Sequence, residues 1–329
     1  MDVSVVVPVF NEEDNVAALV RRLHEVMSAQ PRSYELLLVD DGSSDRTWAR
    51  LAEFAGTVPH LRLIRFRRNF GQTSAMSAGF DHARGDAIVT LDADLQNDPA
   101  DIPRVLDALT PEIDVVSGWR KDRKDAFLNR RLPSILANAL ISKITGVALH
   151  DYGCTLKAYR REVIRNVRLY GEMHRFIPAL VNWVGGNVTE VVVGHHPRRF
   201  GKSKYGLSRT FRVVLDLITV KFLLRYSQGP MQMFGKLAAF FAVPGVLLLL
   251  FMTGANLVYN FTHVEFAAAE MIKRPFWLTM SFVMIFMGMQ FLSIGLLSEV
   301  QTRIYHESQS KPTYVVREIL DSDGPVPSA

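Results

Sequence analysis

Two long stretches without a formally charged residue lie in the C-terminal third of this 329-residue chain, at positions 237–261 and 276–298. Each is longer than the roughly 20 residues that an α-helix needs to cross the apolar core of a bilayer. The alternative, a pair of buried core helices, fits poorly because neither stretch has a polar face. We therefore predict a hairpin of two transmembrane helices within positions 231–298, embedded in a lipid bilayer.

Basic residues around these stretches predict the orientation of the hairpin, because lysine and arginine concentrate in cytoplasmic loops. The connection between the stretches holds only Lys273 and Arg274 as basic residues. Many more flank the hairpin, at Arg198, Arg199, Lys202, Lys204, Arg209, Arg212, Lys221, Arg225, Lys236, Arg303, Lys311 and Arg317. Both termini are therefore expected in the cytoplasm, and a single cysteine, Cys154, fits that reducing compartment.

Positions 1–120 alternate short apolar runs with helix-like stretches, which is the pattern of an α/β fold. Strands are predicted at 3–9, 35–39, 61–66, 87–91 and 114–117, and helices at 13–29, 45–54, 73–83 and 99–109. Nearly continuous runs of valine, isoleucine and leucine predict a mainly parallel sheet that is covered on both faces. Further helices at 127–146 and 174–184 and a strand at 188–193 complete an expected domain at 1–205.

Two further segments connect this domain to the membrane and to the C-terminus. Positions 206–230 predict an amphipathic helix lying at the membrane surface, although a plain surface helix packed on the domain is the alternative. Positions 299–329 are expected to form a cytoplasmic tail, which is disordered after Asp321.

Polar residues follow three of the predicted strands at the point where each strand ends. They are Asn11-Glu12, Asp40-Asp41 and Asp92-Ala93-Asp94. Ligands of an open parallel sheet bind beyond the carboxyl ends of its strands, so these clusters predict one shared site. Two neighbouring carboxylates suit Mg²⁺ or Mn²⁺, which usually shares its coordination shell with substrate phosphates. An Asp-x-Asp in an ordinary surface loop is the alternative.

Several other classes of protein fit the sequence poorly. The net charge of +5 and pI near 9.3 could suggest nucleic acid, but much of the basic charge flanks the hairpin, where anionic lipid and phosphate substrates explain it better. No Gly-x-Gly-x-x-Gly follows the first strand, which disfavours a dinucleotide. Gly201-Lys202-Ser203 is no Walker motif, because His196 stands where that motif needs glycine.

Several motifs together identify a family that this sequence resembles. They are Val7-Pro8-Val9-Phe10-Asn11-Glu12-Glu13, Val39-Asp40-Asp41-Gly42-Ser43, Arg68-Asn69-Phe70-Gly71-Gln72, Leu91-Asp92-Ala93-Asp94-Leu95-Gln96, Asp151-Tyr152-Gly153-Cys154, Lys157-Ala158-Tyr159-Arg160-Arg161 and Arg199-Phe200-Gly201-Lys202-Ser203-Lys204-Tyr205. The chain resembles the polyprenyl-phosphate glycosyltransferases of family 2, which have a Rossmann-like GT-A fold. This branch includes dolichyl-phosphate mannose synthase and the undecaprenyl-phosphate glucosyl- and 4-deoxy-4-formamido-L-arabinosyltransferases.

The resemblance implies a role for each polar cluster. Nucleotide-sugar contacts carry over to Pro8, Asn11, Glu12, Asp40, Asp41, Asp92 and Gln96. The ligands of a Mn²⁺ or Mg²⁺ ion carry over to Asp92, Asp94 and Gln96. Such an ion would neutralise the charge that develops on the departing nucleotide, which makes Asp94 a predicted catalytic residue.

The second substrate implied by the resemblance is a lipid phosphate. A phosphate monoester has a second pKa of about 6, so a strong general base is unnecessary and positioning should dominate. Asp151 and Arg120 are the further predicted catalytic residues; a structural ion pair of Asp151 with a nearby arginine is the alternative. Phosphate and acceptor binding is assigned to a glycine-containing basic loop, with a patch held to anionic lipid as the alternative. Its residues are Arg198, Arg199, Lys202, Ser203 and Lys204.

The function that follows is the inverting transfer of a sugar from a UDP-sugar to undecaprenyl or another polyprenyl phosphate, at a bacterial inner membrane. The resemblance also implies a homo-oligomer, a tetramer in many members. A processive polysaccharide synthase is disfavoured, because no Gln-x-x-Arg-Trp motif occurs and two spans cannot readily line a pore. An inactive nucleotide-sugar-binding membrane scaffold is the third possibility. The sequence does not identify the sugar.

Overall fold

The computed structural model describes residues 1–121, 132–167, 169, 171, 173–197, 230–263, 275–308 and 313–322. The chain forms two compact units. The first comprises Met1–Lys221 with Pro312–Ala329, and the second comprises Phe222–Lys311.

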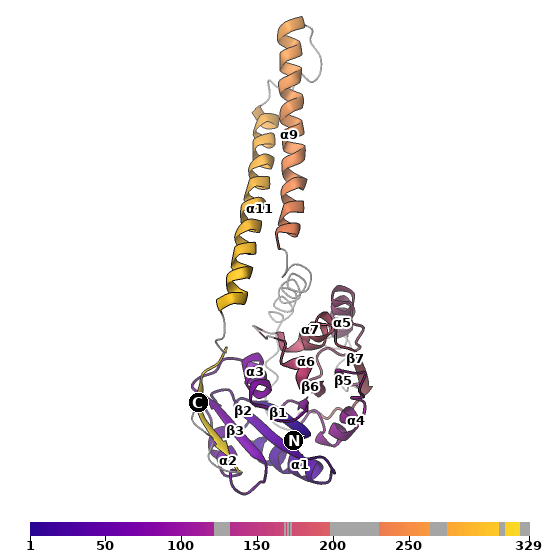
Figure 1. Cartoon of the computed structure of the whole chain (residues 1–329), viewed down its shortest axis with the longest axis vertical. Helices are drawn as coiled ribbons and strands as arrows, with labels where there is room; N and C mark the ends of the chain where they lie inside the picture. The colour runs from indigo at the N-terminus through magenta and orange to yellow at the C-terminus, as the bar shows by residue number, and fades with distance from the viewer. Residues whose placement is uncertain are drawn as a thin grey trace. The chain divides into compact units, whose positions relative to one another are not determined.

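The first unit contains an eight-stranded sheet with the order β7-β5-β6-β4-β1-β2-β3-β8 (Figure 1). The strands are β1 (Val3–Val9), β2 (Tyr34–Asp40), β3 (Leu61–Phe66), β4 (Ala87–Thr90), β5 (Val115–Trp119), β6 (Lys157–Arg160), β7 (Val188–Val192) and β8 (Val316–Asp321). Strand β6 is antiparallel to both of its neighbours, and β8 is antiparallel to β3. The remaining pairs are parallel, so the predicted mainly parallel α/β sheet is confirmed.

Helices cover both faces of the sheet, as the nearly continuous apolar strands require. They are α1 (Val16–Ser28), α2 (Thr47–Ala52), α3 (Gln72–His82), α4 (Ile102–Asp107), α5 (Leu132–Thr145), α6 (Arg161–Ile164) and α7 (Ile177–Trp183), with 3-10 turns η1 (Pro99–Asp101) and η3 (Met173–Phe176). Leu19 and Leu23 of α1 belong to the core formed with alternate residues of β1, such as Val5. On the opposite face, Phe80 of α3 packs edge-to-face on Tyr159 of β6.

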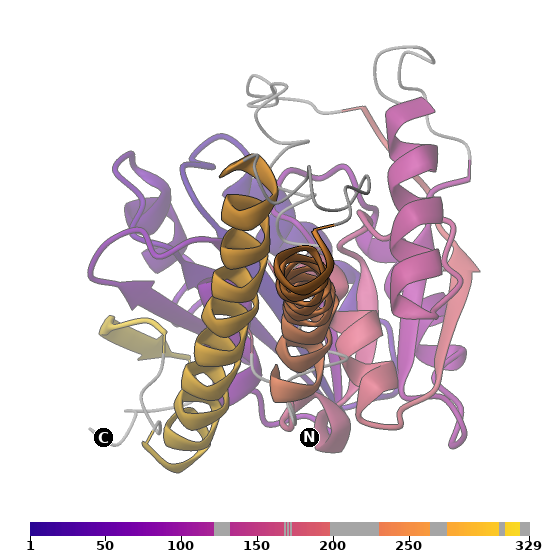
Figure 2. The ribbon, with the colours of Figure 1, turned by 90° about the horizontal axis from the view of Figure 1, so that it is seen from above.

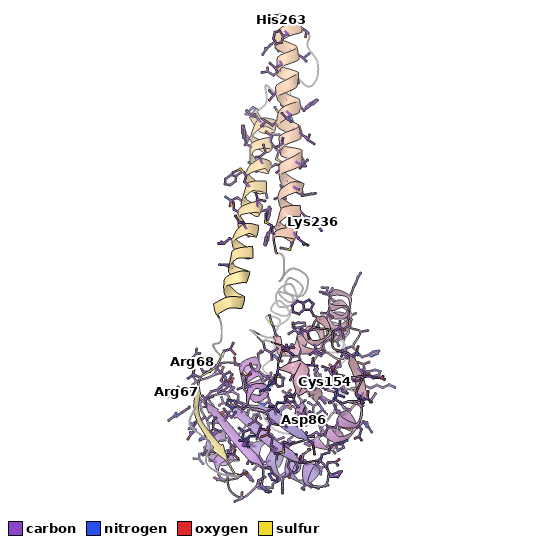
Figure 3. All side chains as sticks on the ribbon, viewed as in Figure 1. Arg67, Arg68, Asp86, Cys154, Lys236 and His263 are labelled. Carbon is purple, nitrogen blue, oxygen red and sulfur yellow. The ribbon has the colours of Figure 1, made fainter. Side chains whose placement is uncertain are left out.

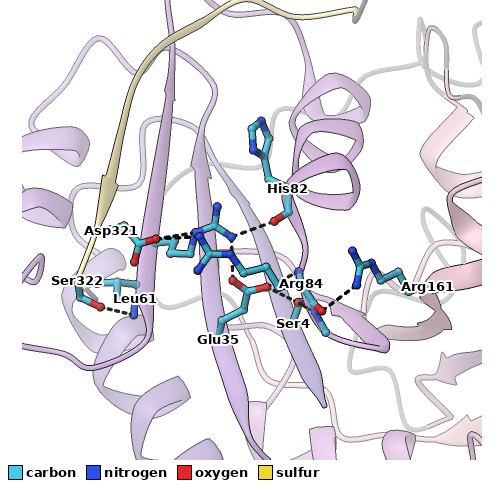
Figure 4. A network of polar contacts seen from close by, with 10 residues as sticks. Ser4, Glu35, Leu61, His82, Arg84, Arg161, Asp321 and Ser322 are labelled. Atoms are coloured by element: carbon cyan, nitrogen blue, oxygen red, sulfur yellow. Dashed lines mark hydrogen bonds and ion pairs between the residues drawn. The ribbon is translucent and has the colours of Figure 1, made fainter. Parts of the chain in front are cut away.

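Strand β8 corrects the predicted domain boundaries, because it lies in the segment that the sequence pattern assigns to a separate tail. The carboxylate of its last residue, Asp321, forms an ion pair with Arg62, with 3.2 Å between Oδ2 and Nε, and Arg62 Nη1 donates a hydrogen bond to Glu35 Oε2 at 2.9 Å. All three side chains are at most 6% exposed, and Figure 4 shows the network that they form with neighbouring polar groups. Ser322 and Leu61 exchange two further hydrogen bonds. The segment after the hairpin is thus an integral part of the first unit.

The second unit contains α9 (Pro230–Thr262) and α11 (Pro275–Ser308), which lie side by side (Figure 2). Two spans, Met231–Thr262 and Pro275–Ser298, are long and apolar enough to cross a membrane, with mean hydropathies of 2.2 and 1.9. Gly288 lets the helices approach closely, since a Cβ there would lie 2.6 Å from Ala242 Cβ. Of the amphipathic helix predicted at 206–230, residues 206–229 lie outside the described residues, and Pro230 begins α9.

Candidate functional site

The loops that follow β1 and β2 are joined by hydrogen bonds through Asn11. Its backbone N–H donates to Ser43 Oγ at 2.9 Å, and its Oδ1 accepts from the Ser44 N–H at 2.9 Å. The next residue, Glu12, donates its N–H to Thr47 Oγ1 at 2.8 Å. Pro8 is half-buried within β1. Asn11 and Glu12 therefore connect the loop after β1 to the segment after β2, at the same edge of the sheet as Asp40 and Asp41.

Asp40 and Asp41 have different partners at the end of β2. Asp40 is fully buried; its Oδ1 accepts a hydrogen bond from the backbone N–H of Ser43 at 3.2 Å, and its Oδ2 lies 3.8 Å from Arg65 Nε. Asp41 accepts hydrogen bonds from the backbone N–H groups of Phe70 and Gly71, at 2.7 and 2.9 Å. Burial raises the pKa of Asp41 to about 6 despite these bonds. Both carboxylates therefore stabilise loops at this edge, and a direct contact with a nucleotide stays a prediction for each.

Gly42 allows the loops after β2 and β3 to meet. Its φ is +68°, and a Cβ there would lie 2.4 Å from the carbonyl carbon of Arg68. A larger residue would push apart the two loops that Asp41 connects.

Asp92 and Asp94 follow β4, the strand next to β1. Asp92 Oδ1 accepts from Gln72 Nε2 at 2.8 Å, and Asp94 Oδ1 accepts from the backbone N–H of Gln96 at 3.1 Å. Between them and Gln96, Leu95 has a φ of +58°, a conformation that non-glycine residues adopt rarely and often at functional sites. Burial, with the charge of Asp94 added, raises the pKa of Asp92 to about 6.

This pair of carboxylates suits a hard divalent cation. Both offer oxygen ligands, and a cation would stabilise the charged form of Asp92, which burial and then the charge of Asp94 disfavour by raising its pKa. Within the described part of the chain, no group of three His, Cys, Asp or Glu residues could hold an ion alone. A Mn²⁺ or Mg²⁺ ion held by Asp92, Asp94 and Gln96 would therefore complete its shell with substrate or water oxygens.

Arg120 and Asp151 form a two-pronged ion pair. Arg120 Nε lies 2.7 Å from Asp151 Oδ2, and Nη2 lies 3.1 Å from Oδ1. Asp151 also accepts the Gly153 N–H at 3.1 Å. Burial lowers the pKa of Arg120, but the hydrogen bond and charge of Asp151 outweigh it and raise that pKa above its usual value. The ion pair that the sequence left open as an alternative therefore forms, and it occupies the carboxylate that a general base would need.

A cavity of about 50 Å³ opens beside Asp92. Its walls are formed by Gln72, Met76, Asp92, Tyr152, Gly153, Cys154, Thr155, Lys157, Tyr159, His174 and Arg175. Cys154, labelled in Figure 3, is fully buried here. No sequence motif predicted a role for Lys157, His174 or Arg175, although a lysine between Leu156 and Ala158 was an available signal.

The basic loop predicted to bind phosphate and acceptor lies outside the described residues. It comprises Arg198, Arg199, Lys202, Ser203 and Lys204. Its role stays a prediction.

Comparison with known proteins identifies similar sequences over nearly the whole chain. The family model described as Glycosyl transferase family 2 matches residues 4–168. The chain is 44% identical to the dodecaprenyl-phosphate galacturonate synthase of Rhizobium johnstonii, a match that covers 98% of this chain and 94% of that protein. It is 38% identical to the undecaprenyl-phosphate 4-deoxy-4-formamido-L-arabinose transferase of Edwardsiella ictaluri, covering 98% and 95%.

Solved structures resemble about two thirds of the chain in fold. Mannosyl-3-phosphoglycerate synthase from Rubrobacter xylanophilus matches with a TM-score of 0.56 and 19% identity, over 68% of this chain and 74% of that chain. Glucosyl-3-phosphoglycerate synthase from Mycobacterium tuberculosis, in complex with Mn²⁺, UDP and glucosyl-3-phosphoglycerate, matches with a TM-score of 0.53 and 18% identity, over 67% and 79%. The GT-A fold and the resemblance to polyprenyl-phosphate glycosyltransferases are both confirmed by these similarities.

Proposed function

This chain belongs to glycosyltransferase family 2, and on that premise we propose that it transfers a sugar from a UDP-sugar to undecaprenyl phosphate or another polyprenyl phosphate. Relatives that match nearly the whole chain act with dodecaprenyl and undecaprenyl phosphate, which supports the acceptor. The two relatives have different sugars in their names, so these names do not identify the sugar that this chain transfers. The observation that carries the proposal is the meeting of Asp92, Asp94 and the loops around Asn11 and Asp41 at one edge of the sheet, in a chain with two candidate membrane spans.

The reaction needs no strong base. The oxygen of a phosphate monoester is already anionic near neutral pH, because its second pKa is about 6. That oxygen forms a bond to the anomeric carbon, while the bond from this carbon to the β-phosphate breaks and UDP leaves with the electron pair. Attack from the opposite side inverts the anomeric centre. A bound Mn²⁺ or Mg²⁺ ion would neutralise charge on the departing diphosphate.

The residues of the site would then position the two substrates. Asp92, Asp94 and Gln96 would hold the diphosphate side, and Asn11 and Glu12 the nucleoside side. Asp151 fixes the guanidinium of Arg120 by two hydrogen bonds, so that Arg120 can present its remaining nitrogen, Nη1, to a phosphate oxygen. The basic loop at 198–204 is proposed to bind the acceptor phosphate.

The path of the chain supports the proposed orientation in the membrane. The chain leaves the first unit before α9 and returns after α11 to pair β8 with β3. Because both flanking segments belong to one folded unit, two crossings place them on the same side of a bilayer. The excess of basic residues in these segments favours the cytoplasmic side. We propose the inner membrane of a bacterium, and a homo-oligomer, for which tetramers of the family are the precedent.

A transfer assay with radiolabelled UDP-sugars, undecaprenyl phosphate and Mg²⁺ or Mn²⁺ tests the proposal. Asp94→Asn should abolish labelled lipid, whereas Asp107→Asn should not, because Asp107 is 65% exposed and contacts only Arg32 among the described residues. Activity that survives in Asp94→Asn would refute the metal assignment. Polymer instead of monosaccharyl lipid on a thin-layer plate would indicate a processive synthase. UDP binding without turnover would indicate a scaffold.

A further inference from the structure

The cavity beside Asp92 is too small for a whole sugar ring. Its volume of about 50 Å³ accommodates about three to five water-sized groups. It is therefore suited to one substituent of a hexose. Asp92, which contributes to its wall, belongs to the proposed diphosphate site, so a sugar attached to that diphosphate begins next to the cavity.

Strand β6 brings a lysine into this wall. Because β6 is antiparallel to β4, its first residue, Lys157, pairs with Thr90, the last residue of β4. Thr90 precedes Asp92 by two positions, and Lys157 therefore lies at the edge of the sheet where substrates bind. A parallel strand would have put its first residue at the opposite edge.

Lys157 is a buried cation, and among the described residues no carboxylate forms an ion pair with it. It is 2% exposed, and its ammonium donates to the carbonyl oxygens of Tyr152 (at 3.3 Å) and Cys154. An ammonium has three donors, so one remains for a ligand. Burial lowers the pKa of Lys157, and the charges of Asp151 and Asp92 offset this only in part. A buried ammonium is costly unless an anion accompanies it.

The other lining residues add to the positive charge. Arg175 is half-buried and contacts the ring of His174 through its Nε, at 3.4 Å. Across the described ranges, neither Lys157 nor Arg175 forms an ion pair with a carboxylate. Asp92 is the one acidic side chain in the wall as described, and the proposed metal ion would neutralise it. An anion is therefore the ligand group that this cavity fits.

We propose that the cavity binds the C6 carboxylate of a uronic-acid donor through Lys157 and Arg175, which makes a UDP-uronate the preferred sugar donor. This inference rests on the proposed function, because it assigns the sugar of that same reaction. A hydroxymethyl or formamido group in the cavity would leave the ammonium without a counter-charge, whereas a carboxylate accepts a charge-assisted hydrogen bond from it. Lys157 and Arg175 are thus specificity-determining residues.

Donors that differ only at C6 test this directly. The full chain in detergent is assayed with UDP-galacturonate against UDP-galactose, and with UDP-glucuronate against UDP-glucose, using undecaprenyl phosphate. We expect kcat/KM to favour one uronate over its hexose by on the order of 10- to 100-fold, since a hydrogen bond to a charged group has that value. Lys157→Met should remove most of this preference and Arg175→Met a smaller part. Lys143→Met, at an exposed lysine of α5, is the matched control and should keep it.

The ratio of the two donors separates specificity from damage to the fold. Lys157→Met also removes hydrogen bonds to two carbonyl groups, which could lower both activities, but a structural defect would leave the ratio unchanged and so overturn the inference. If the wild-type chain uses hexose donors with the same kcat/KM as uronate donors, the carboxylate site is overturned while the proposed function stands. An equal rise in the KM for polyprenyl phosphate with every donor would assign Lys157 to the acceptor phosphate instead.

Donor binding keeps the two proposals distinct if no transfer is observed. Titration calorimetry compares UDP-galacturonate with UDP-galactose, and UDP-glucuronate with UDP-glucose, in wild type and Lys157→Met. If wild type binds a uronate donor more tightly than its hexose, and Lys157→Met abolishes this difference, the carboxylate site is supported even though the proposed transfer has failed. Equal binding of both members of each pair would overturn it.

Discussion

Breaking the ion pair between Arg120 and Asp151 separates its structural role from its catalytic role. The groups meet at 2.7 and 3.1 Å, and their side chains are 12% and 4% exposed. Removing one partner of a buried pair costs about 3–5 kcal/mol, because the other charge is left uncompensated. Since Arg120 keeps some contact with water, we expect about 3 kcal/mol for Arg120→Met. For a domain of this size that lowers the unfolding midpoint by about 6–12 °C.

The double variant Arg120→Met/Asp151→Leu leaves no charge unpaired. Replacing a buried pair by apolar residues is often neutral, so its unfolding midpoint should return to within about 4 °C of wild type. Sugar transfer should nevertheless stay at least about 100-fold below wild type, which is the usual loss when a charge-stabilising donor is removed. Thermal unfolding of the detergent-solubilised chain by circular dichroism and the radiolabelled transfer assay give the two readouts.

Arg32 and Asp107 provide a matched control, because they also meet at 2.7 Å but are 35% and 65% exposed. Arg32→Met should cost no more than about 1 kcal/mol. Two results would refute the reasoning. An unchanged midpoint in Arg120→Met would mean that the pair is solvated, and wild-type transfer by the double variant would mean that Arg120 is purely structural.

Three further perturbations follow from the structure. Folding raises the pKa of Asp41 from 3.8 to about 6, so the folded chain binds this proton more tightly than the unfolded chain. Wild type should therefore lose about 2 kcal/mol of stability relative to Asp41→Asn as the pH rises from 4 to 6, measured by denaturant unfolding. Asp321→Ala should cost about 1.5–3 kcal/mol, because it removes an ion-pair partner of buried Arg62 and a charged hydrogen bond from Arg84. Glu318→Ala, at a 41% exposed carboxylate of the same strand, should cost less than about 1 kcal/mol. In the hairpin, Gly288→Leu should separate α9 from α11 at a cost of about 1–3 kcal/mol, and Gly254→Leu should not, since nothing lies within 4 Å of its Cβ position.

Each of these has an outcome that contradicts it. A constant stability difference between wild type and Asp41→Asn across that pH range would mean that the carboxylate titrates normally in the folded chain. Equal thermal stability of the Asp321 and Glu318 variants would show that β8 is held by its backbone alone. Equal resistance of the two glycine variants in a titration with sodium dodecyl sulfate would exclude close helix packing at position 288.

Most of the sheet could be predicted because its strands are nearly continuous apolar runs that need no partner to be recognised. Strand β1 has one half-buried residue, Pro8, among buried ones, and such a run indicates a central parallel strand by itself. Strand β8 could not be predicted in this way. Its partner β3 lies across the membrane hairpin in sequence, as in the pair Arg65 and Glu318, 253 positions apart. Register over that distance is set by tertiary contacts and leaves no local pattern.

The same distinction explains which part of the site was predictable. Asp92, Asp94 and Asn11 follow parallel strands, whose carboxyl ends share one edge, so position along the chain was enough to bring them together. Lys157 reaches that edge only because β6 runs in the opposite direction, and strand direction is not encoded in a four-residue segment. A charged residue in a buried strand conflicts with its surroundings, and such local conflicts concentrate at functional sites. Lys157 was therefore a local signal in the sequence for the proposed binding of a donor carboxylate, which the positions of Asp92 and Asp94 do not predict.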